Sequence, residues 1–250
     1  MKSLLFTLLL AFVFVLPLSS QAQNPCNPCG KAGTKFHVND PMGRNSVTFK
    51  SQAPLEDIIG TTNQITGYIN FDPQNPDKGG HGKLTVAVAS LNTGIPLRNE
   101  HLLGADWLDA SKYPDITIEI EKVKDIKKVK STKGSATYDV TIVADLSIHG
   151  KTRRVDVAGR ITYLKESEQT RTKLAGDLLA MRATFAVNLN DFDITGPKGS
   201  GLIGSKVGET IEIEVSVLGS TSEAMAANPC NPCNPCKGKA KKNPCNPCGK

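Results

Sequence analysis

The feature that most constrains the fold is an alternation of apolar and polar side chains with a period of two, which begins at Phe36. In residues 116–121 and 211–217, Ile or Val occupies every second position, and Glu, Thr or Ser stands between them. Successive side chains of a strand point to opposite faces, so this pattern is typical of antiparallel strands with one apolar face. It predicts further strands at residues 65–71, 84–89, 138–142, 155–161 and 185–189.

Turn-forming residues separate these segments, among them Asp72-Pro73, Gly79-Gly80, Lys133-Gly134 and Gly196-Pro197. Residues 96–103 predict a helix, because Pro96 suits a first turn and Gly104 follows the last one. A second short turn is expected over residues 107–110. About eight strands with so little helix indicate an all-β fold, and the pattern leaves a sandwich and a closed barrel both open.

Residues 1–22 have the features of a secretory signal peptide. Lys2 supplies a positive charge, residues 4–18 form an apolar run, and the small residues Ser20 and Ala22 predict cleavage between Ala22 and Gln23. The run is shorter than the about 20 residues that span a bilayer. We therefore expect export to the periplasm or out of the cell, with no transmembrane segment in the mature chain.

The formal charge of +6 belongs to the ends of the chain. Seven lysines and one glutamate lie outside residues 33–221 and account for all of this charge, so the central part is neutral. A neutral body provides no counterion release on binding nucleic acid. We therefore expect no nucleic-acid partner.

The sequence contains no motif that indicates catalysis. Residues 199–204 match the spacing G-x-G-x-x-G, but a loop precedes them and a strand follows, whereas a dinucleotide-binding motif opens a helix. The four histidines lack a zinc-hydrolase spacing, and the central part has neither a cysteine nor a G-x-S-x-G motif. We expect a protein that is not an enzyme, has no catalytic residues and requires no cofactor.

Several separate motifs occur in a fixed order through the central part. SLNTGIPLRNEHL at residues 90–102 is followed by ADWLD at 105–109 and by KYP at 112–114. GYINFDP at 67–73 precedes them, and ADLSIHGKT at 144–152, NDF at 190–192 and VGETIEI at 207–213 come after. Together these motifs resemble the YceI-like family of exported bacterial lipid-binding proteins. Asn99, Asn190 and Asp193 stand where that family more often has Asp, Arg and Gly.

This resemblance implies an extended, antiparallel, eight-stranded, lipocalin-like β-barrel with one or two short helices, over residues 35–219. It also implies an apolar ligand inside the barrel, such as an isoprenoid lipid or a quinone-like tail, which the protein sequesters or carries. A protein in water can carry such a chain only by burying it, at about 0.8 kcal/mol for each methylene.

The candidate ligand contacts are aromatic residues of the predicted strands and loops, together with charged residues of the family motifs. Ordinary core packing is the competing interpretation for each aromatic residue, and orientation of loops is the competing interpretation for the charged ones. The predicted ligand-binding residues are Phe36, Phe49, Tyr68, Phe71, Arg98, His101, Trp107, Tyr138, His149, Phe185 and Phe192.

All seven cysteines lie in Asn-Pro-Cys repeats, within a linker at residues 23–34 and a tail at residues 220–250 that we expect to be disordered. Three interpretations remain open: a soft metal ion such as Cu(I), disulfide-linked or metal-linked self-association, and a low-complexity tail without a ligand. The alternative function is therefore metal or thiol handling by the tails, with the barrel as a scaffold. The candidate metal ligands are Cys26, Cys29, Cys230, Cys233, Cys236, Cys245 and Cys248.

Overall fold

A computed structural model describes residues 33–223 of the chain. The predicted signal peptide, nearly all of the predicted linker and all of the candidate cysteine ligands lie outside the described residues. The last strand of the described part continues to Ser220.

Ten strands, two α-helices and three short 3-10 helices form within residues 33–223. The strands are β1 (Thr34–Val38), β2 (Ser46–Gln52), β3 (Asp57–Thr62), β4 (Ile65–Phe71), β5 (Gly80–Ala87), β6 (Asp115–Thr132), β7 (Ser135–Ile148), β8 (Lys151–Leu164), β9 (Leu178–Asn188) and β10 (Thr210–Ser220). The helices are η1 (Pro76–Lys78), η2 (Val88–Ser90), α1 (Pro96–Leu103), α2 (Glu168–Arg171) and η3 (Leu189–Phe192).

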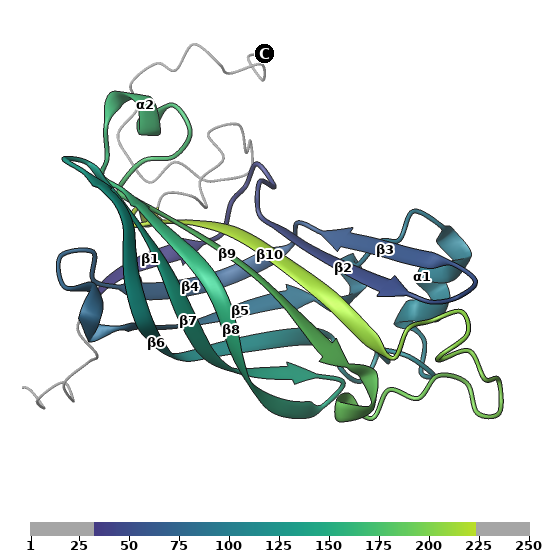
Figure 1. The fold of residues 1–250 in the computed structure, drawn as a ribbon. Helices are drawn as coiled ribbons and strands as arrows, with labels where there is room; N and C mark the ends of the chain where they lie inside the picture. Colours follow the sequence, from purple (N-terminus) through teal and green to yellow (C-terminus); the bar gives the residue numbers. More distant parts are fainter. Residues whose placement is uncertain (1–32, 224–250) are drawn as a thin grey trace, which may run out of the picture. The chain divides into compact units, whose positions relative to one another are not determined.

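Eight of the strands form a closed antiparallel ring (Figure 1). They pair in the order β1, β4, β5, β6, β7, β8, β9 and β10, and the pairing of β1 with β10 closes the ring. The predicted eight-stranded barrel with short helices is therefore confirmed. The remaining two strands form a hairpin, in which β2 pairs with β10 and β3 pairs with β2.

Strand β10 has a different partner at each of its ends. Near its last residue it meets β1 through the single pair His37–Ser220, whereas residues 211–216 pair with β2. The outer edge of β3 is joined to the segment before α1 by one bridge, between Thr61 and Asn92. Sheet hydrogen bonding thus closes the ring at the β1 end and leaves the β3 end of the barrel as its mouth.

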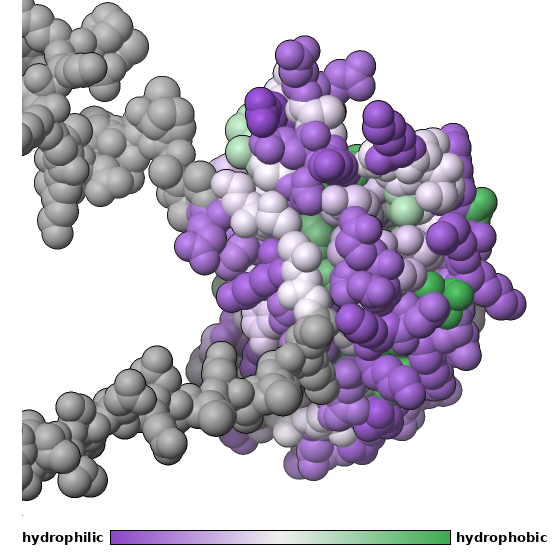
Figure 2. Space-filling view, turned by 90° about the vertical axis from the view of Figure 1, so that its left-hand side faces the viewer, coloured by the Kyte–Doolittle hydropathy of each residue, from purple (hydrophilic) through white to green (hydrophobic). Residues whose placement is uncertain are grey.

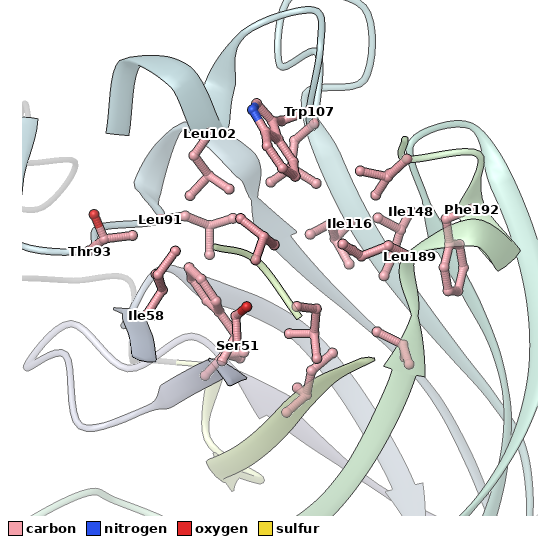
Figure 3. A pocket seen from close by; sticks show the side chains of 18 of the residues that line it. Ser51, Ile58, Leu91, Thr93, Leu102, Trp107, Ile116, Ile148, Leu189 and Phe192 are labelled. Atoms are coloured by element: carbon pink, nitrogen blue, oxygen red, sulfur yellow. The ribbon is translucent and has the colours of Figure 1, made fainter. Parts of the chain in front are cut away.

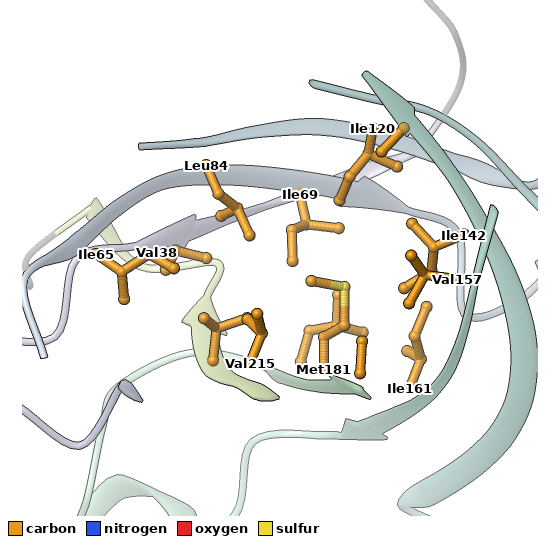
Figure 4. Close-up of a cluster of buried hydrophobic side chains, with 14 of the residues drawn as sticks. Val38, Ile65, Ile69, Leu84, Ile120, Ile142, Val157, Ile161, Met181 and Val215 are labelled. Atoms are coloured by element: carbon orange, nitrogen blue, oxygen red, sulfur yellow. The ribbon is translucent and has the colours of Figure 1, made fainter. Parts of the chain in front are cut away.

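The closed end of the barrel is packed with side chains. Phe36, Phe71, Ile161 and Leu179 have no exposed surface, because alternate residues of their strands point inward. Side chains from β4, β7, β9 and β10 fill the same interior (Figure 4). Figure 2 shows the outside of this end, which is mostly hydrophilic.

The predicted helix and turns are found with small differences. The helix over residues 96–103 is confirmed as α1, and residues 104–110 form hydrogen-bonded turns, with Trp107 N donating to Gly104 O. Residues 199–204 lie in the loop before β10 and open no helix. No sequence pattern predicts α2, a single turn capped by the side chains of Ser167 and Thr170.

Candidate functional site

A cavity of about 380 Å³ lies in the mouth of the barrel. At this end β2, β5, β7 and β9 stop, and β6 and β10 begin. Twenty-four of its thirty lining residues are apolar. Figure 3 shows side chains from β2, β3, α1, β6, β7 and η3 converging on this space. The volume falls within the range of about 300–1,000 Å³ that is usual for small-molecule sites.

A row of side chains crosses the floor of the cavity. In the sheet register Ile213 of β10 pairs with Phe49 of β2 on one side and with Phe185 of β9 on the other, and all three line the cavity. Phe49 is paired in turn with Gly60 of β3. A Cβ atom at Gly60 would lie 2.1 Å from Cζ of Phe49, so the ring lies over this glycine.

Two aromatic residues from loops complete the apolar wall. The ring of Trp107 packs against Gly196 in the loop before β10, where an added Cβ would lie 3.2 Å from the indole Cη2. Phe192, at the end of η3, is almost completely buried. Figure 3 shows both rings beside the aliphatic side chains of the strand ends.

The six polar lining residues are Ser51, Glu56, Thr93, Arg98, His101 and Lys206. Ser51 is buried, and its hydroxyl accepts a hydrogen bond of 2.8 Å from Gly208 N, which ties β2 to the loop before β10. The Arg98 guanidinium donates to the Glu56 carboxylate at 2.7 Å, which links α1 to the β2–β3 connection. Two of the six polar lining residues, Arg98 and Glu56, therefore form an ion pair with each other.

The residues before α1 are held by a small hydrogen-bond network. Asn99 Oδ1 accepts from the backbone N and the hydroxyl of Thr93, at 2.8 and 2.7 Å. Its Nδ2 donates to Asn92 Oδ1 at 2.9 Å, and that oxygen also accepts from Gly94 N. The network fixes the start of α1, and with it Arg98 and His101, against the bridge that Asn92 makes to β3.

His149 links three of the sequence motifs at the same end of the barrel. Its ring packs edge-on against Tyr113 at a centroid distance of 4.8 Å, and its Nδ1 lies 3.1 Å from the carbonyl oxygen of Phe192. Tyr113 also covers Gly150, which has a positive φ in the turn between β7 and β8. His149 is thus placed where it orients η3, and it is not among the lining residues.

Asp193 stands where the resemblance predicts a glycine, and the structure shows how an aspartate is accommodated there. The residue has a φ of 56°, in the left-handed region that favours glycine and tolerates Asp. Its carboxylate pairs with Lys151 at 2.8 Å. The hydrogen bond from Lys151 lowers the pKa of Asp193 below its ordinary value. The negative charge of Asp193 is therefore paired with the neighbouring Lys151.

The structure brings together six of the eleven predicted ligand-binding residues. Phe49, Arg98, His101, Trp107, Phe185 and Phe192 line the cavity. Phe36, Phe71 and Tyr138 lie in the packed core of the closed end, where strand alternation turns them inward below the cavity. Tyr68 lies under the Lys35 ammonium, 5.0 Å from the ring centroid. Ligand contact remains a prediction for the six lining residues.

Most of the cavity wall is aliphatic, and sequence reasoning did not single it out. These residues include Ile58, Leu91, Leu102, Ile116, Ile118, Leu146, Ile148, Val187, Leu189, Ile211 and Ile213. Those on β6 and β10 follow the alternation of the sequence, but inward residues at a strand end have the same pattern as core residues. For those that lie on strands, a position within two or three residues of a strand end is the sequence feature that could have identified them.

Within residues 33–223, no group of three or more His, Cys, Asp or Glu side chains is arranged to hold a metal ion. None of the helices in the same range is long and apolar enough to cross a bilayer. The candidate cysteine ligands lie outside this range.

Comparison with known proteins gives one family match. Residues 39–218 match the family of YceI-like domains. A UPF0312 protein of Pseudomonas putida is 31% identical over 164 residues, which make up 65% of this chain and 73% of the relative. A UPF0312 protein of Ectopseudomonas mendocina is 29% identical over 192 residues, 76% of this chain and 90% of the relative.

Solved structures share the fold at low sequence identity. BcnA of Burkholderia cenocepacia superposes with a TM-score of 0.54 at 18% identity, over 72% of this chain and 98% of that one. A polyisoprenoid-binding domain from Saccharophagus degradans, implicated in plant cell wall breakdown, gives a TM-score of 0.54 at 12% identity, over 76% and 99%. At these identities the likeness establishes the barrel fold.

Proposed function

This chain belongs to the YceI-like family, and from that premise we propose that its barrel binds an apolar, isoprenoid-type chain and so sequesters or carries it. The observation that carries the proposal is the cavity of about 380 Å³ with an almost wholly apolar lining at the barrel mouth. The Saccharophagus degradans domain with the same fold is described as polyisoprenoid-binding, which supports this ligand class.

The size of the cavity limits how much of a chain it can enclose. If a methylene needs about the 30 Å³ that a water molecule occupies, a cavity of about 380 Å³ holds roughly a dozen such groups. This corresponds to two or three isoprene units. Burying about a dozen methylenes contributes on the order of 10 kcal/mol before the costs of association are deducted. A longer chain would continue out through the mouth.

We propose separate roles for the six predicted residues that line the cavity. The rings of Phe49, Trp107, Phe185 and Phe192 pack against the apolar chain, because they form its floor and walls. Arg98 and His101 lie on α1 at the rim, where a polar end of the ligand would leave the cavity. The role is binding, and we assign no catalytic residue.

We further propose that the protein acts in the periplasm or outside the cell. The signal-peptide features of residues 1–22 support this location. In such a compartment a carrier prevents the apolar chain from meeting water. The Asn-Pro-Cys repeats favour a second candidate function, metal or thiol handling by the tails, because all seven cysteines are concentrated there.

Native mass spectrometry of the mature protein, purified gently from its own host, tests the proposal. We expect an adduct of a few hundred daltons that organic solvent extracts. In the variant Ile213→Trp the larger side chain enters the centre of the cavity floor, and we expect at least tenfold less adduct. The matched control Glu212→Trp carries the same side chain on the opposite face of β10. Full occupancy of Ile213→Trp, or no adduct in the native protein, would contradict the proposal.

Deleting both cysteine-bearing segments from the mature chain separates the two candidate functions. Retention of the apolar adduct by residues 33–223, with loss of any copper or zinc increment, would assign lipid binding to the barrel. Loss of the adduct with the tails would contradict the proposed function.

A further inference from the structure

Exposed apolar side chains gather beside the mouth of the barrel. Within residues 33–223, four large apolar side chains that are 46% to 69% exposed lie on neighbouring segments at the mouth. Leu55 precedes β3, Ile59 lies on β3, and Ile95 and Leu97 lie at the start of α1. These four residues form the mouth patch.

An ion pair and a backbone bridge hold the segments of the mouth patch together. Glu56, next to Leu55, pairs with Arg98, next to Leu97, at 2.7 Å. The backbone bridge between Thr61 and Asn92 sets the edge of β3 beside the segment that leads into Ile95. Figure 1 shows β3 and α1 together at this end of the molecule. The patch is therefore formed by two chain segments that lie side by side at the mouth.

The mouth patch is continuous with the cavity. Ile95 and Leu97 are exposed, at 46% and 60%, and they also line the cavity. Ile58 of β3 lines it as well, whereas Ile59 points to the opposite face of that strand. An apolar chain can thus pass from the outside of the mouth to the inside along apolar side chains.

One basic side chain lies beside the mouth patch, and a second is exposed elsewhere on the same loop. Leu55 N donates to the carbonyl oxygen of Ser205 at 3.3 Å, which places Lys206 beside the patch. Lys198 is exposed on the same loop. Neither lysine forms an ion pair with any residue from 33 to 223. Lipid surfaces with anionic headgroups complement such an arrangement, since apolar side chains insert while lysines contact the headgroups.

We propose that the mouth patch docks on a lipid bilayer that contains anionic lipids, so that the ligand passes directly between membrane and cavity. This inference rests on the proposed function. Each methylene that crosses water slows transfer by about fourfold, so direct contact between mouth and membrane removes most of that barrier. The opposite, closed end shows mainly hydrophilic residues, which gives the docking a direction (Figure 2).

Co-sedimentation of the mature chain with vesicles of phosphatidylcholine and phosphatidylglycerol in a three-to-one ratio tests the docking surface. The double variant Leu55→Ser/Ile59→Thr changes two patch residues that do not line the cavity. We expect its vesicle affinity to fall about tenfold or more. Met42→Ser is the matched control, because Met42 is 75% exposed in the β1–β2 connection, away from the patch.

The outcomes separate the docking surface from its alternatives. Absence of vesicle binding by the native chain, or an equal loss in Met42→Ser, would overturn the docking proposal. So would a change from dimer to monomer in sedimentation velocity with unchanged vesicle binding, because the patch would then join two copies of this chain. The single variant Leu55→Ser replaces the double variant if circular dichroism shows that the latter is unfolded.

Native mass spectrometry of the same samples separates the two proposals from each other. A bound apolar chain without vesicle binding would contradict the docking surface alone. Vesicle binding by a protein whose cavity is empty would contradict the proposed function alone.

Discussion

At the scale of single residues, Gly60 sets the shape of the cavity floor. The row that runs from Gly60 through Phe49 and Ile213 to Phe185 has a side chain at every position except the first. The missing side chain gives the Phe49 ring a place to lie, and the ring then leaves the cavity open. The smallest residue of the row thus determines how much volume its largest neighbours leave for a ligand.

Gly60→Ala is therefore expected to narrow the cavity. The new Cβ would fall 2.1 Å from Cζ of Phe49, so the ring must move toward the ligand space. We expect a stability loss of about 1–3 kcal/mol from overpacking and a shorter preferred ligand. Thermal unfolding and the mass of the extracted adduct measure the two effects.

Gly134→Ala is the control for this change. Gly134 lies in the turn between β6 and β7, where an added Cβ would meet nothing closer than 4.0 Å. Its ligand and its unfolding temperature should match those of the native chain. An unchanged adduct in Gly60→Ala would show that the Phe49 ring does not limit the cavity.

At the scale of elements, the start of α1 depends on Asn99. The family more often has Asp here, but in this chain Asn99 Nδ2 donates to Asn92 Oδ1. A carboxylate cannot donate, so Asn99→Asp would place two acceptors 2.9 Å apart. We expect a loss of about 1 kcal/mol and faster amide exchange over residues 96–103.

Asn63→Asp provides the same change of charge at an exposed turn between β3 and β4. It should leave amide exchange in α1 unchanged. Slow exchange in Asn99→Asp would mean that the Thr93 bonds alone hold the helix.

The elements also show what sequence patterns capture. Residues 211–217 and 116–121 alternate strictly because each strand has a packed face and a hydrated face, and both were predicted as strands. Strand β3, with the sequence DIIGTT, was not predicted, because Ile58 and Ile59 are adjacent and face opposite ways. One lines the cavity and the other lies on the mouth patch, so the strand is apolar on both faces and lacks the alternation that prediction relies on.

At the scale of the whole molecule, the barrel was predictable and the extent of the cavity was not. The family motifs contain Arg98 and His101 of α1, Trp107 and Phe192, which are predicted ligand contacts and line the cavity. Phe36 and Tyr138 looked equally suitable as ligand contacts, yet they lie in the packed end. Their difference from Phe49 depends on where along the barrel the core stops, which follows from register and closure between distant strands.

Stability against acid should depend on Glu166, near α2. The hydrogen bond from Arg171 and that from Gly176 N lower the pKa of Glu166 to about 2. The folded state thus favours the carboxylate, and its contribution is complete above the ordinary value of 4.5 and is lost as the pH falls toward 2. We expect the unfolding temperature to fall between about pH 5 and pH 2.5, and to fall less steeply in Glu166→Gln.

Glu168→Gln removes a carboxylate from the first turn of α2 without removing an ion pair with a described residue. Calorimetry of this control should reproduce the native slope. Identical slopes in all three proteins would assign acid sensitivity to other carboxylates.

The closure of the ring has a mechanical consequence. Fourteen residue pairs join β7 to β8, but a single pair, His37 with Ser220, joins β1 to β10. The described chain begins just before β1 and ends just after β10, so both cysteine-bearing segments attach at this seam. If a force pulled the two ends of the described chain apart, it would act first on the pairing of β1 with β10, which is the weakest pairing in the ring. These two strands would separate while the long strands β7 and β8 stayed paired.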